Sequence, residues 1–496
     1  MLHEGAKTRF ILCFLTDTID VNFSIRQGDP LAMLLYIIYV EPLLIVLEKS
    51  LTGLRLPNVQ EVLESYCDDL NVLTDDPDDF LKLSSTVDQF EKVSGAILSR
   101  DRKCKVLGLG KWAGREQWPL DWLQTVKSVK VFGIFISNNY REIISLNWNF
   151  RLEKFRRTIM SWSSRRLDTL QQRIEVLRSF ALSRVYYVAS ILPLRQSLVK
   201  QFETLIGKFL WKGRILRVAL EELKNGYLDG GLNLPCIGTM NRSLLASQCL
   251  RLINSGDQKS IAHLDYWMGP VLEEIFADFG HAASAVETPD YFLFIGECIA
   301  EIRMSDLLST DTADKLSNRK IYEDLAHFPT PKVAEGSTVN YKRIWKRLVL
   351  GHILTLEEQD CLYLLINNKL SVPERLYRIG MRDTFDCSFC TGNICSDLVH
   401  FFCGCIRTRD IWCWLRSKID NMASSQHCSD WEMLNLAFPQ TRKEKTVVWM
   451  IGVYVGYIWQ RSTEGDIDFG KFFGFLSFKY KETGSNVIGH IDALAV

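Results

Sequence analysis

The sequence carries no net charge, because its 59 basic and 59 acidic side chains cancel over 496 residues. No field of one sign over the whole chain therefore argues for a nucleic acid or a membrane as partner. It also has no internal repeat and no low-complexity tract. With 47% hydrophobic and 24% charged residues, the composition is that of a globular protein and excludes a broadly disordered chain.

Long hydrophobic runs are missing too. The first residues, MLHEGAKTRF, contain no apolar core of a signal peptide. The longest apolar runs, residues 30–40 and 447–459, fall short of a bilayer span, and we expect both to form buried helices. Fourteen cysteines without a signal peptide indicate a reducing, intracellular compartment, nuclear or cytoplasmic, with thiols free or metal-bound.

The charges that are present are unevenly placed. Residues 61–90 hold nine acidic side chains and one basic one, whereas residues 151–220 hold fifteen basic and four acidic ones. The second block predicts either a helical face that neutralises phosphates or an ordinary solvated face. Its basic side chains that lie mostly off the apolar stripes are Arg151, Lys154, Arg156, Arg157, Arg165, Arg166, Arg173, Arg178 and Arg184.

Two neighbouring carboxylates, Asp68 and Asp69, stand between two apolar stretches, 61–66 and 70–74, that read as the strands of a hairpin. Like charges side by side repel, and a divalent cation would remove that repulsion. Magnesium prefers oxygen ligands, and phosphoryl transfer uses two such ions. The pattern therefore indicates either a magnesium site or a solvated acidic turn.

A third pattern combines cysteine and histidine. Cys387-x2-Cys390-x9-His400-x4-Cys405 has the spacing of a CCHC-type site, in which three thiolates and an imidazole surround one structural zinc ion. Cys395 and Cys403 compete for the same ligand set. Seven of the fourteen cysteines lie in residues 387–428, which indicates a site rather than scattered core thiols.

Motifs before and after the acidic hairpin occur in a definite order. They are Arg26-Gln27-Gly28-Asp29-Pro30-Leu31, Tyr66-Cys67-Asp68-Asp69, Ser94-Gly95 through Lys103, Phe132-Gly133, FLWKGR (209–214) and GGLNLP (230–235). In order and spacing the set resembles the reverse transcriptase of non-LTR (LINE-type, jockey-like) retrotransposons. Many such proteins also end in a zinc knuckle followed by an aromatic-rich segment, as the CCHC pattern does here.

The resemblance implies roles for single residues. Asp68 and Asp69 would be catalytic and bind magnesium, Asp68 as the main ligand. Arg26, Gln27, Gly28 and Asp29 would position template and nucleotide. Arg102 or Lys103 would lie near the triphosphate, although Ser99 replaces the family's Asn. Phe132, in place of the family's Leu, and Gly133 would form a hairpin that grips the primer; from the residues alone, 129–137 reads equally as one ordinary strand.

The fold class that follows is α+β. We expect a partial reverse-transcriptase palm (1–140), a basic helical thumb (141–235), a helical connection (236–380), a zinc knuckle (381–415) and a helical tail (416–496). Palms of this family also have a further catalytic carboxylate on an upstream strand, and a fingers subdomain. The 25 residues before Arg26 leave no room for either.

The resemblance therefore implies an RNA-directed DNA polymerase family member that is inactive as this chain, with RNA template and DNA primer as partners. An upstream polypeptide would supply the fingers and an endonuclease. The alternative is a non-catalytic nucleic-acid-binding remnant that uses only the thumb and the knuckle.

Overall fold

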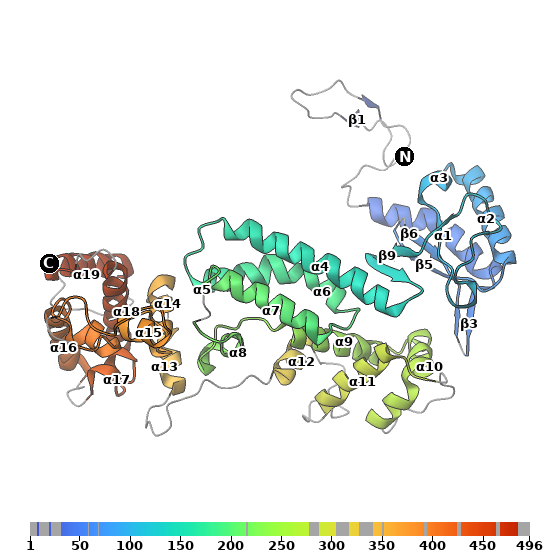
Figure 1. Ribbon diagram of the computed structural model, residues 1–496. Coiled ribbons are helices and arrows are strands. Elements are labelled where there is room, and N and C mark those ends of the chain that lie inside the picture. The colour runs from blue at the N-terminus through green and yellow to red at the C-terminus, as the bar shows by residue number, and fades with distance from the viewer. Residues whose placement is uncertain are drawn as a thin grey trace. The chain divides into compact units, whose positions relative to one another are not determined.

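The computed structural model is rich in helices (Figure 1). Its strands form five two-stranded sheets in the described residues. Four of these sheets are antiparallel and one, β7–β8, is parallel. A helical protein with small antiparallel sheets agrees with the expected α+β composition, whereas the palm fold itself stays a prediction. The structure describes the strands Lys7–Thr8 and Ile19–Asp20 and residues 31–57, 59–67, 69–214, 217–276, 287–303, 317–326, 341–349, 352–390, 394–423, 428–462 and 467–484.

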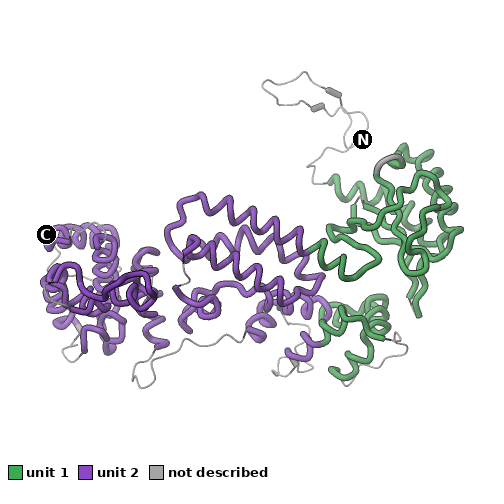
Figure 2. The backbone as a smooth tube through the Cα atoms, in the orientation of Figure 1, with its two compact units in different colours: residues 1–147, 250–296 green, residues 148–249, 297–496 purple. Residues whose placement is uncertain are grey.

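The chain divides into two compact units, and both are discontinuous in sequence (Figure 2). Unit 1 comprises Met1–Asn147 and Leu250–Gly296, and unit 2 comprises Trp148–Cys249 and Glu297–Val496. The five-part division expected from the sequence is untested by this split and stays a prediction. Each unit is described by itself below.

Unit 1 contains all the strands of the described residues. Its elements are β1 (Lys7–Thr8), β2 (Ile19–Asp20), α1 (Ala32–Ser50), β3 (Leu54–Leu56), β4 (Val59–Glu61), β5 (Leu63–Tyr66), β6 (Asp69–Val72), α2 (Asp78–Ser94), α3 (Arg100–Lys103), β7 (Lys105–Val106), β8 (Gln124–Thr125), β9 (Ser128–Val131), β10 (Ile134–Ser137) and α10 (Gln258–Ile275). The expected hairpin at the acidic doublet is β5–β6, in which Tyr66 pairs with Asp69. The stretch 129–137 is a hairpin, β9–β10, rather than one strand.

Helix α1 overturns one expectation. The apolar run that opens it was expected to be buried, but Leu47 is the one fully buried residue of the helix. Ile38, Leu34 and Met33 are 69%, 58% and 53% exposed. The described part of unit 1 packs α1 against α2 and β5. Tyr39 contacts Phe90 and the Ser94 carbonyl of α2, and near the C-terminal end of α1 Leu47 joins Leu51, Val62 and Leu63 in a small core.

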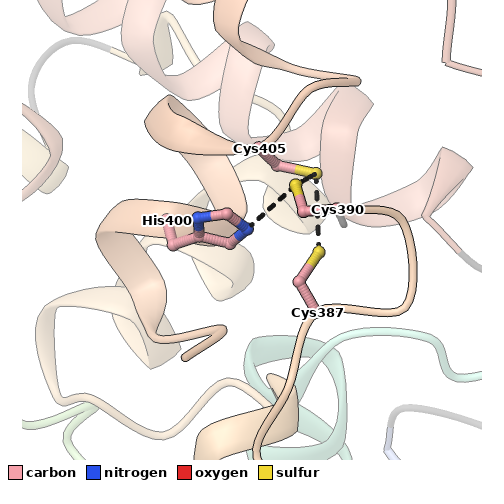
Figure 3. Close-up of side chains that lie close together, drawn as sticks. All are labelled: Cys387, Cys390, His400 and Cys405. Carbon is pink, nitrogen blue, oxygen red and sulfur yellow. Dashed lines mark hydrogen bonds between the residues drawn. The ribbon is translucent and has the colours of Figure 1, made fainter. Parts of the chain in front are cut away.

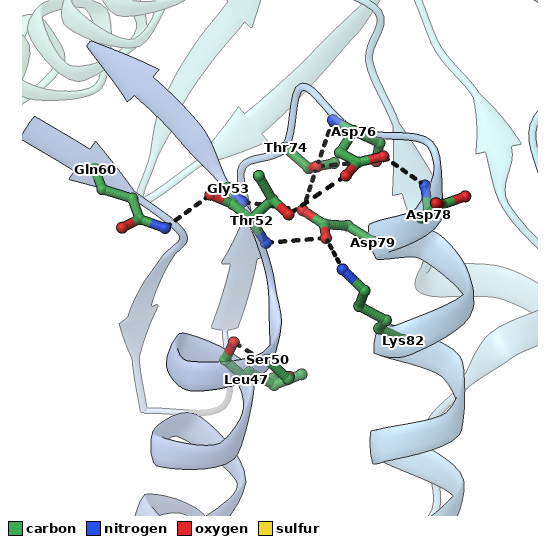
Figure 4. A network of polar contacts seen from close by, with 10 residues as sticks. All are labelled: Leu47, Ser50, Thr52, Gly53, Gln60, Thr74, Asp76, Asp78, Asp79 and Lys82. Carbon is green, nitrogen blue, oxygen red and sulfur yellow. Dashed lines mark hydrogen bonds and ion pairs between the residues drawn. The ribbon is translucent and has the colours of Figure 1, made fainter. Parts of the chain in front are cut away.

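The start of α2 ties the strands of unit 1 together through Asp79 (Figure 4). Its buried carboxylate accepts hydrogen bonds from the backbone N–H groups of Thr52 and Gly53, both at 2.9 Å, and from the Thr74 hydroxyl at 2.7 Å. Burial raises the pKa of Asp79, but these bonds outweigh it, and the pKa lies below its ordinary value. Asp79, one of the acidic residues of the 61–90 block, therefore has a structural role: it holds the start of α2 against the backbone before β3.

A long-range ion pair joins the two sequence segments of unit 1. Glu61, which is 7% exposed, lies 2.6 Å from the Lys259 ammonium and 2.6 Å from the His263 imidazole, both on α10. Burial raises the pKa of Glu61, and the hydrogen bonds from Lys259 and His263 outweigh it, so that its pKa is lowered. The second segment therefore neutralises a buried carboxylate of the first.

The first part of unit 2 is a helical layer. It contains most of α4 (Tyr140–Ser163), then α5 (Leu170–Val176), a π-helical segment (Leu177–Leu182), α6 (Ser183–Ala189), α7 (Gln196–Leu210), α8 (Leu220–Lys224) and most of α9 (Ile237–Asn254). The first residues of α4 and the last residues of α9 belong to unit 1. The apolar stripes expected on these helices face its core: Phe155, Leu177 and Val185 are fully buried. Asn241 of α9 holds the layer together, because its amide donates to the carbonyls of Ala189 and Leu192 at 2.7 and 2.9 Å.

The C-terminal part of unit 2 is built around α18. Its elements are the second half of α11 (Asp290–Arg303), which begins in unit 1, and α12 (Asn318–Leu325), α13 (Tyr341–Leu348), α14 (Leu356–Ile366), α15 (Pro373–Arg378), α16 (Arg409–Ala423), α17 (Asp430–Leu434), α18 (Glu444–Arg461) and α19 (Phe469–Thr483). Every residue of α18 from Thr446 to Ile458 is buried, which confirms the expected burial of this apolar run. Across the described ranges, no helix is both long and apolar enough to cross a membrane.

Candidate metal centre and nucleic-acid interface

The four side chains of the CCHC pattern come together in unit 2 (Figure 3). Cys387 and Cys390 lie on a loop whose base is closed by two backbone hydrogen bonds, from Cys387 N–H to the Ile394 carbonyl and from Ser396 N–H to the Phe385 carbonyl, both at 2.9 Å. His400 opens a short π-helical turn (His400–Gly404), and Cys405 ends it. The Asp397 carboxylate accepts from the His400 N–H at 2.7 Å and fixes the start of this turn.

The spacing of the ligand atoms fits one tetrahedral metal ion. All four lie within 4.8 Å of one another. The Cys387 and Cys405 sulfurs are 3.7 Å apart, the Cys390 and Cys405 sulfurs 3.9 Å, and the Cys390 sulfur is 3.5 Å from His400 Nε2. Thiolates bound to zinc at about 2.3 Å stand about 3.8 Å apart at tetrahedral angles, so the cluster can hold a zinc ion with little movement.

The loop favours the thiolate form of Cys387 even without a metal ion. Burial raises the pKa of the Cys387 thiol, but hydrogen bonds from the Phe389 and Cys390 backbone and from His400 outweigh it and bring the pKa to about 7. Burial raises the pKa of Cys405 to about 12. A metal ion would overcome that second shift, since a coordinated thiol loses its proton.

The two competing cysteines lie outside the cluster. Cys403 is 4% exposed, and burial raises its pKa, as expected for a core thiol. Cys395 is exposed and takes part in a backbone bridge with Asp386. The structure therefore favours Cys405 as the fourth ligand.

The knuckle (387–405) rests on the α18 core. The Tyr454 hydroxyl of α18 donates to the Phe402 carbonyl inside the π-helical turn, and Trp412 of α16 lies against Tyr454 with ring centroids 5.4 Å apart. Arg407 covers Phe389 at 4.0 Å. The metal-binding loop therefore does not stand alone, and its stability is linked to that of α16 and α18.

The acidic hairpin is described only in part. Asp68 lies outside the described residues, and Asp69 is exposed at the start of β6. Among the described residues, the Cys/His cluster is the one group of three or more acidic, cysteine or histidine side chains close enough to share a metal ion. A magnesium site at Asp68 and Asp69 thus stays a prediction.

The two hairpins named by the motifs do meet. The Tyr66 ring, one residue before the turn of β5–β6, packs edge-on against the Phe132 ring with centroids 6.2 Å apart. Phe132 and Gly133 form the β9–β10 turn with φ of 45° and 87°, and Cys67 turns β5–β6 with φ of 54°. A large side chain with positive φ is rare, so Phe132 is held by its surroundings.

The remaining palm residues are placed less completely. Arg26, Gln27, Gly28 and Asp29 lie outside the described residues, as does the Arg102 side chain. Lys103 ends α3 and is exposed. Their assignment to template, nucleotide and triphosphate stays a prediction.

The basic helical face is real as a surface. Arg156, Arg157, Arg165 and Arg166 are all exposed at the C-terminal half of α4 and just after it. Arg157 pairs with Glu153 at 2.9 Å and Arg165 lies over the Trp162 ring at 4.3 Å, and such exposed pairs contribute little energy. The cations therefore stay available to phosphates.

Arg173 does not belong to this surface. It is 8% exposed, and its guanidinium donates to the backbone carbonyls of Leu167, Asp168 and Leu210. Its position off the apolar stripe predicts a phosphate-binding residue, but its guanidinium binds these backbone carbonyls instead, one at the end of α7 and two just before α5.

A group of cations on α13 escaped the motif search. The helix sequence, YKRIWKRL, places Lys342 and Lys346 one turn apart, with Ile344, Trp345 and Leu348 buried behind them. The alternation of buried and basic residues was visible in the sequence. It matches none of the motifs named above, so the sequence assigns no role to this helix.

Comparison with known proteins gives one informative match. No protein-family model matches the chain. The chain is 25% identical over 255 residues to the Transposon TX1 uncharacterized 149 kDa protein of Xenopus laevis, a match that covers 48% of this chain and 18% of that protein. The chain thus spans less than a fifth of this relative's length, and the similarity supports a transposon origin.

Proposed function

We propose that this chain is a reverse-transcriptase-related protein derived from a non-LTR retrotransposon, and that it binds nucleic acid through the exposed cations of α4 and holds one structural zinc ion in its knuckle. The observation that carries the proposal is the Cys387, Cys390, His400 and Cys405 cluster. It follows a basic helical layer, in the order that the resemblance implies. The similarity to a transposon protein supports the same origin independently.

Nucleic-acid binding rests on charge and exposure. Residues 151–220 carry fifteen basic and four acidic side chains, an excess of eleven, and Arg157 and Arg166 are 77% and 94% exposed. Guanidinium groups on such a surface neutralise phosphates without reading bases. The partner is therefore an RNA or DNA strand of any sequence, as expected for template and primer.

We propose that the ancestor of this chain polymerised DNA with two magnesium ions. We do not propose that this chain polymerises DNA. Two metal ions need a shared cage of carboxylates to align an in-line attack. In the described part of the chain Asp69 has no such cage. We expect Asp68 and Asp69 to attract a cation weakly and to support no extension of a primer.

The proposal is tested by binding of the full chain to a fluorescent single-stranded RNA at several salt concentrations. Reversal to Glu at Arg156, Arg157, Arg165 and Arg166 should weaken binding and lower the slope of log K against log salt by about 3, since each lost phosphate contact removes about 0.7. The matched control reverses four exposed cations elsewhere: Arg319, Arg378, Arg409 and Lys481. Equal effects of the two variants would leave only a solvated helical face.

Primer extension on an RNA template separates the two readings of the doublet. The chain should give no product beyond that of an Asp68→Ala variant at millimolar magnesium. Template-dependent extension that disappears in this variant would show an active polymerase, and the carboxylate cage would then have to include residues outside the described part.

A further inference from the structure

Unit 2 contains a cavity of about 610 Å³ that none of the sequence motifs covers. It is lined by the 3-10 turn Tyr227–Asp229, by α13 and by the start of α18, through Leu228, Asp229, Lys342, Arg343, Lys346, Arg347, Gln440 and Glu444. Four cations face two carboxylates, so the lining has an excess of two positive charges. Its volume is far larger than the roughly 30 Å³ that one water occupies in the liquid.

One wall of the cavity is rigid. Arg347, at 1% exposure, donates to the carbonyls of Leu436 and Phe438 at 2.6 and 2.7 Å and to the Glu444 carboxylate at 2.7 Å. Arg343 also reaches Glu444, at 3.5 Å. Glu444 is therefore neutralised within the wall, and Arg347 is a positioning residue that fixes α13 against α18.

The two lysines of the lining are not neutralised in this way. Lys342 and Lys346 are exposed, one helical turn apart, about 6 Å along the axis, and neither forms an ion pair with another described residue. Asp229 is the one lining carboxylate left beside them. A pair of lysines at one mouth, with the Gln440 amide and the Leu228 side chain nearby, suits an anion attached to a larger, partly apolar group.

We infer that this cavity binds a phosphodiester group of a single nucleic-acid strand, with Lys342 and Lys346 on the phosphates and Leu228 and Gln440 against the sugar or base. Lysines bind phosphates as point charges, and a cavity of this size takes a nucleotide of a strand more readily than a lone ion. The inference rests on the proposal that the chain binds nucleic acid, but it concerns a different surface from α4.

The test measures binding of the full chain to a fluorescent single-stranded RNA. Lys342→Ala/Lys346→Ala should weaken binding roughly fivefold to tenfold and lower the salt slope by about 1.4, the value for two contacts. Lys342→Arg/Lys346→Arg should restore binding, and Asp229→Asn should strengthen it. The control Lys418→Ala/Lys481→Ala removes two charges from α16 and α19 and should change binding less than twofold. Equal weakening by both alanine pairs would overturn the inference.

Protection from an amine-reactive reagent gives an independent readout. Bound RNA should shield Lys342 and Lys346 but not Lys418, as measured by mass spectrometry of the modified chain. If inorganic phosphate shields them as fully as RNA does, the site takes a free phosphate and the strand assignment is wrong. Unchanged binding by the α4 variant, with these two lysines still shielded, would refute the α4 face alone, so the two proposals can fail separately.

Discussion

Helices α1 and α18 are built from similar residues, both rich in Ile, Val and Tyr, but their surroundings differ. In unit 2, α18 packs against α13, α14, α16 and α19 and is buried from Thr446 to Ile458. In unit 1, α1 packs against α2 and β5, and Ile38 is 69% exposed. The composition of an apolar helix allows burial on all sides, but whether the helix is buried depends on the elements that pack against it.

A local difference between the two helices explains part of this. Gly452 and Gly456 lie one turn apart on α18, where an added Cβ would come within 2.4 Å of Leu354 Cδ2 and 3.0 Å of Glu358 Cγ on α14. The two glycines let α14 approach closely. Helix α1 has no glycine and carries Pro42 in its interior, so a second helix cannot approach its backbone as closely.

The largest expected effect comes from a charge placed on each helix. Ile451→Asp buries a carboxylate at a fully buried position and should destabilise the α18 core by more than about 5 kcal/mol. The same change on α1, Ile38→Asp, should cost less than about 0.5 kcal/mol, because that side chain already meets water. Hydrogen exchange of the two regions in the full chain measures both. Similar losses would mean that α1 is covered in solution.

Removing the metal should destabilise the surroundings of α18 and leave α1 unchanged. Zinc at about a thousand times its dissociation constant stabilises the state that binds it by about 4 kcal/mol, and the knuckle contacts α18 through Tyr454 and Phe402. Chelation, or Cys405→Ser, should therefore lower the protection of α16 and α18 and leave α1 unchanged.

The cysteines outside the cluster are the controls for this experiment. Exposed Cys413→Ser and buried Cys403→Ser should both retain one zinc per chain, as counted by metal analysis. Retention of zinc by Cys405→Ser together with its loss in Cys403→Ser would mean that the fourth ligand is Cys403.

The smallest of the three effects concerns the unit that holds α1. Asp79→Ala leaves the buried N–H groups of Thr52 and Gly53 without acceptors and should cost unit 1 about 3 kcal/mol. The neighbouring exposed Asp78→Ala should cost less than about 1 kcal/mol. Hydrogen exchange at β3 and α2 reports both changes, and equal losses would show that Asp79 acts only through the helix dipole.

The same residue makes unit 1 sensitive to acid. The folded pKa of Asp79 lies below its ordinary value of 3.8, so its contribution to stability is fully present above that pH and disappears as the pH falls through the folded pKa. Asp79→Asn should flatten the acid limb of the stability curve of unit 1. An unchanged limb would mean that other carboxylates control it.

Local patterns predicted the elements whose geometry depends on near neighbours. The β5–β6 hairpin follows from strand composition on both sides of Cys67 and Asp68, and the metal cluster follows from ligand spacing, because Cys387, Cys390, His400 and Cys405 lie within one loop and one turn. The burial of α18 was also correct. Ligand spacing left Cys403 open as an alternative, and only its packing in the core removes it.

Features that depend on distant partners were missed. The exposure of α1 depends on what unit 1 places beside it, which its apolar residues do not reveal. Arg173 falls off the apolar stripe of its helix, yet it is buried and donates to the Leu210 carbonyl at the end of α7. The lysines of α13 gain a cavity only because Leu228 and Gln440, more than ninety residues away on either side, come to lie beside them.

The ion pair between Glu61 and α10 has a consequence in time. Its partners, Lys259 and His263, follow it by about two hundred residues in the chain. At a synthesis rate of roughly 5–20 residues per second, Glu61 waits about 10–40 s on the ribosome before any cation of α10 exists to meet it. During that interval unit 1 cannot close, and the α4–α9 layer is made in between, so the second unit has the chance to begin folding before the first is finished.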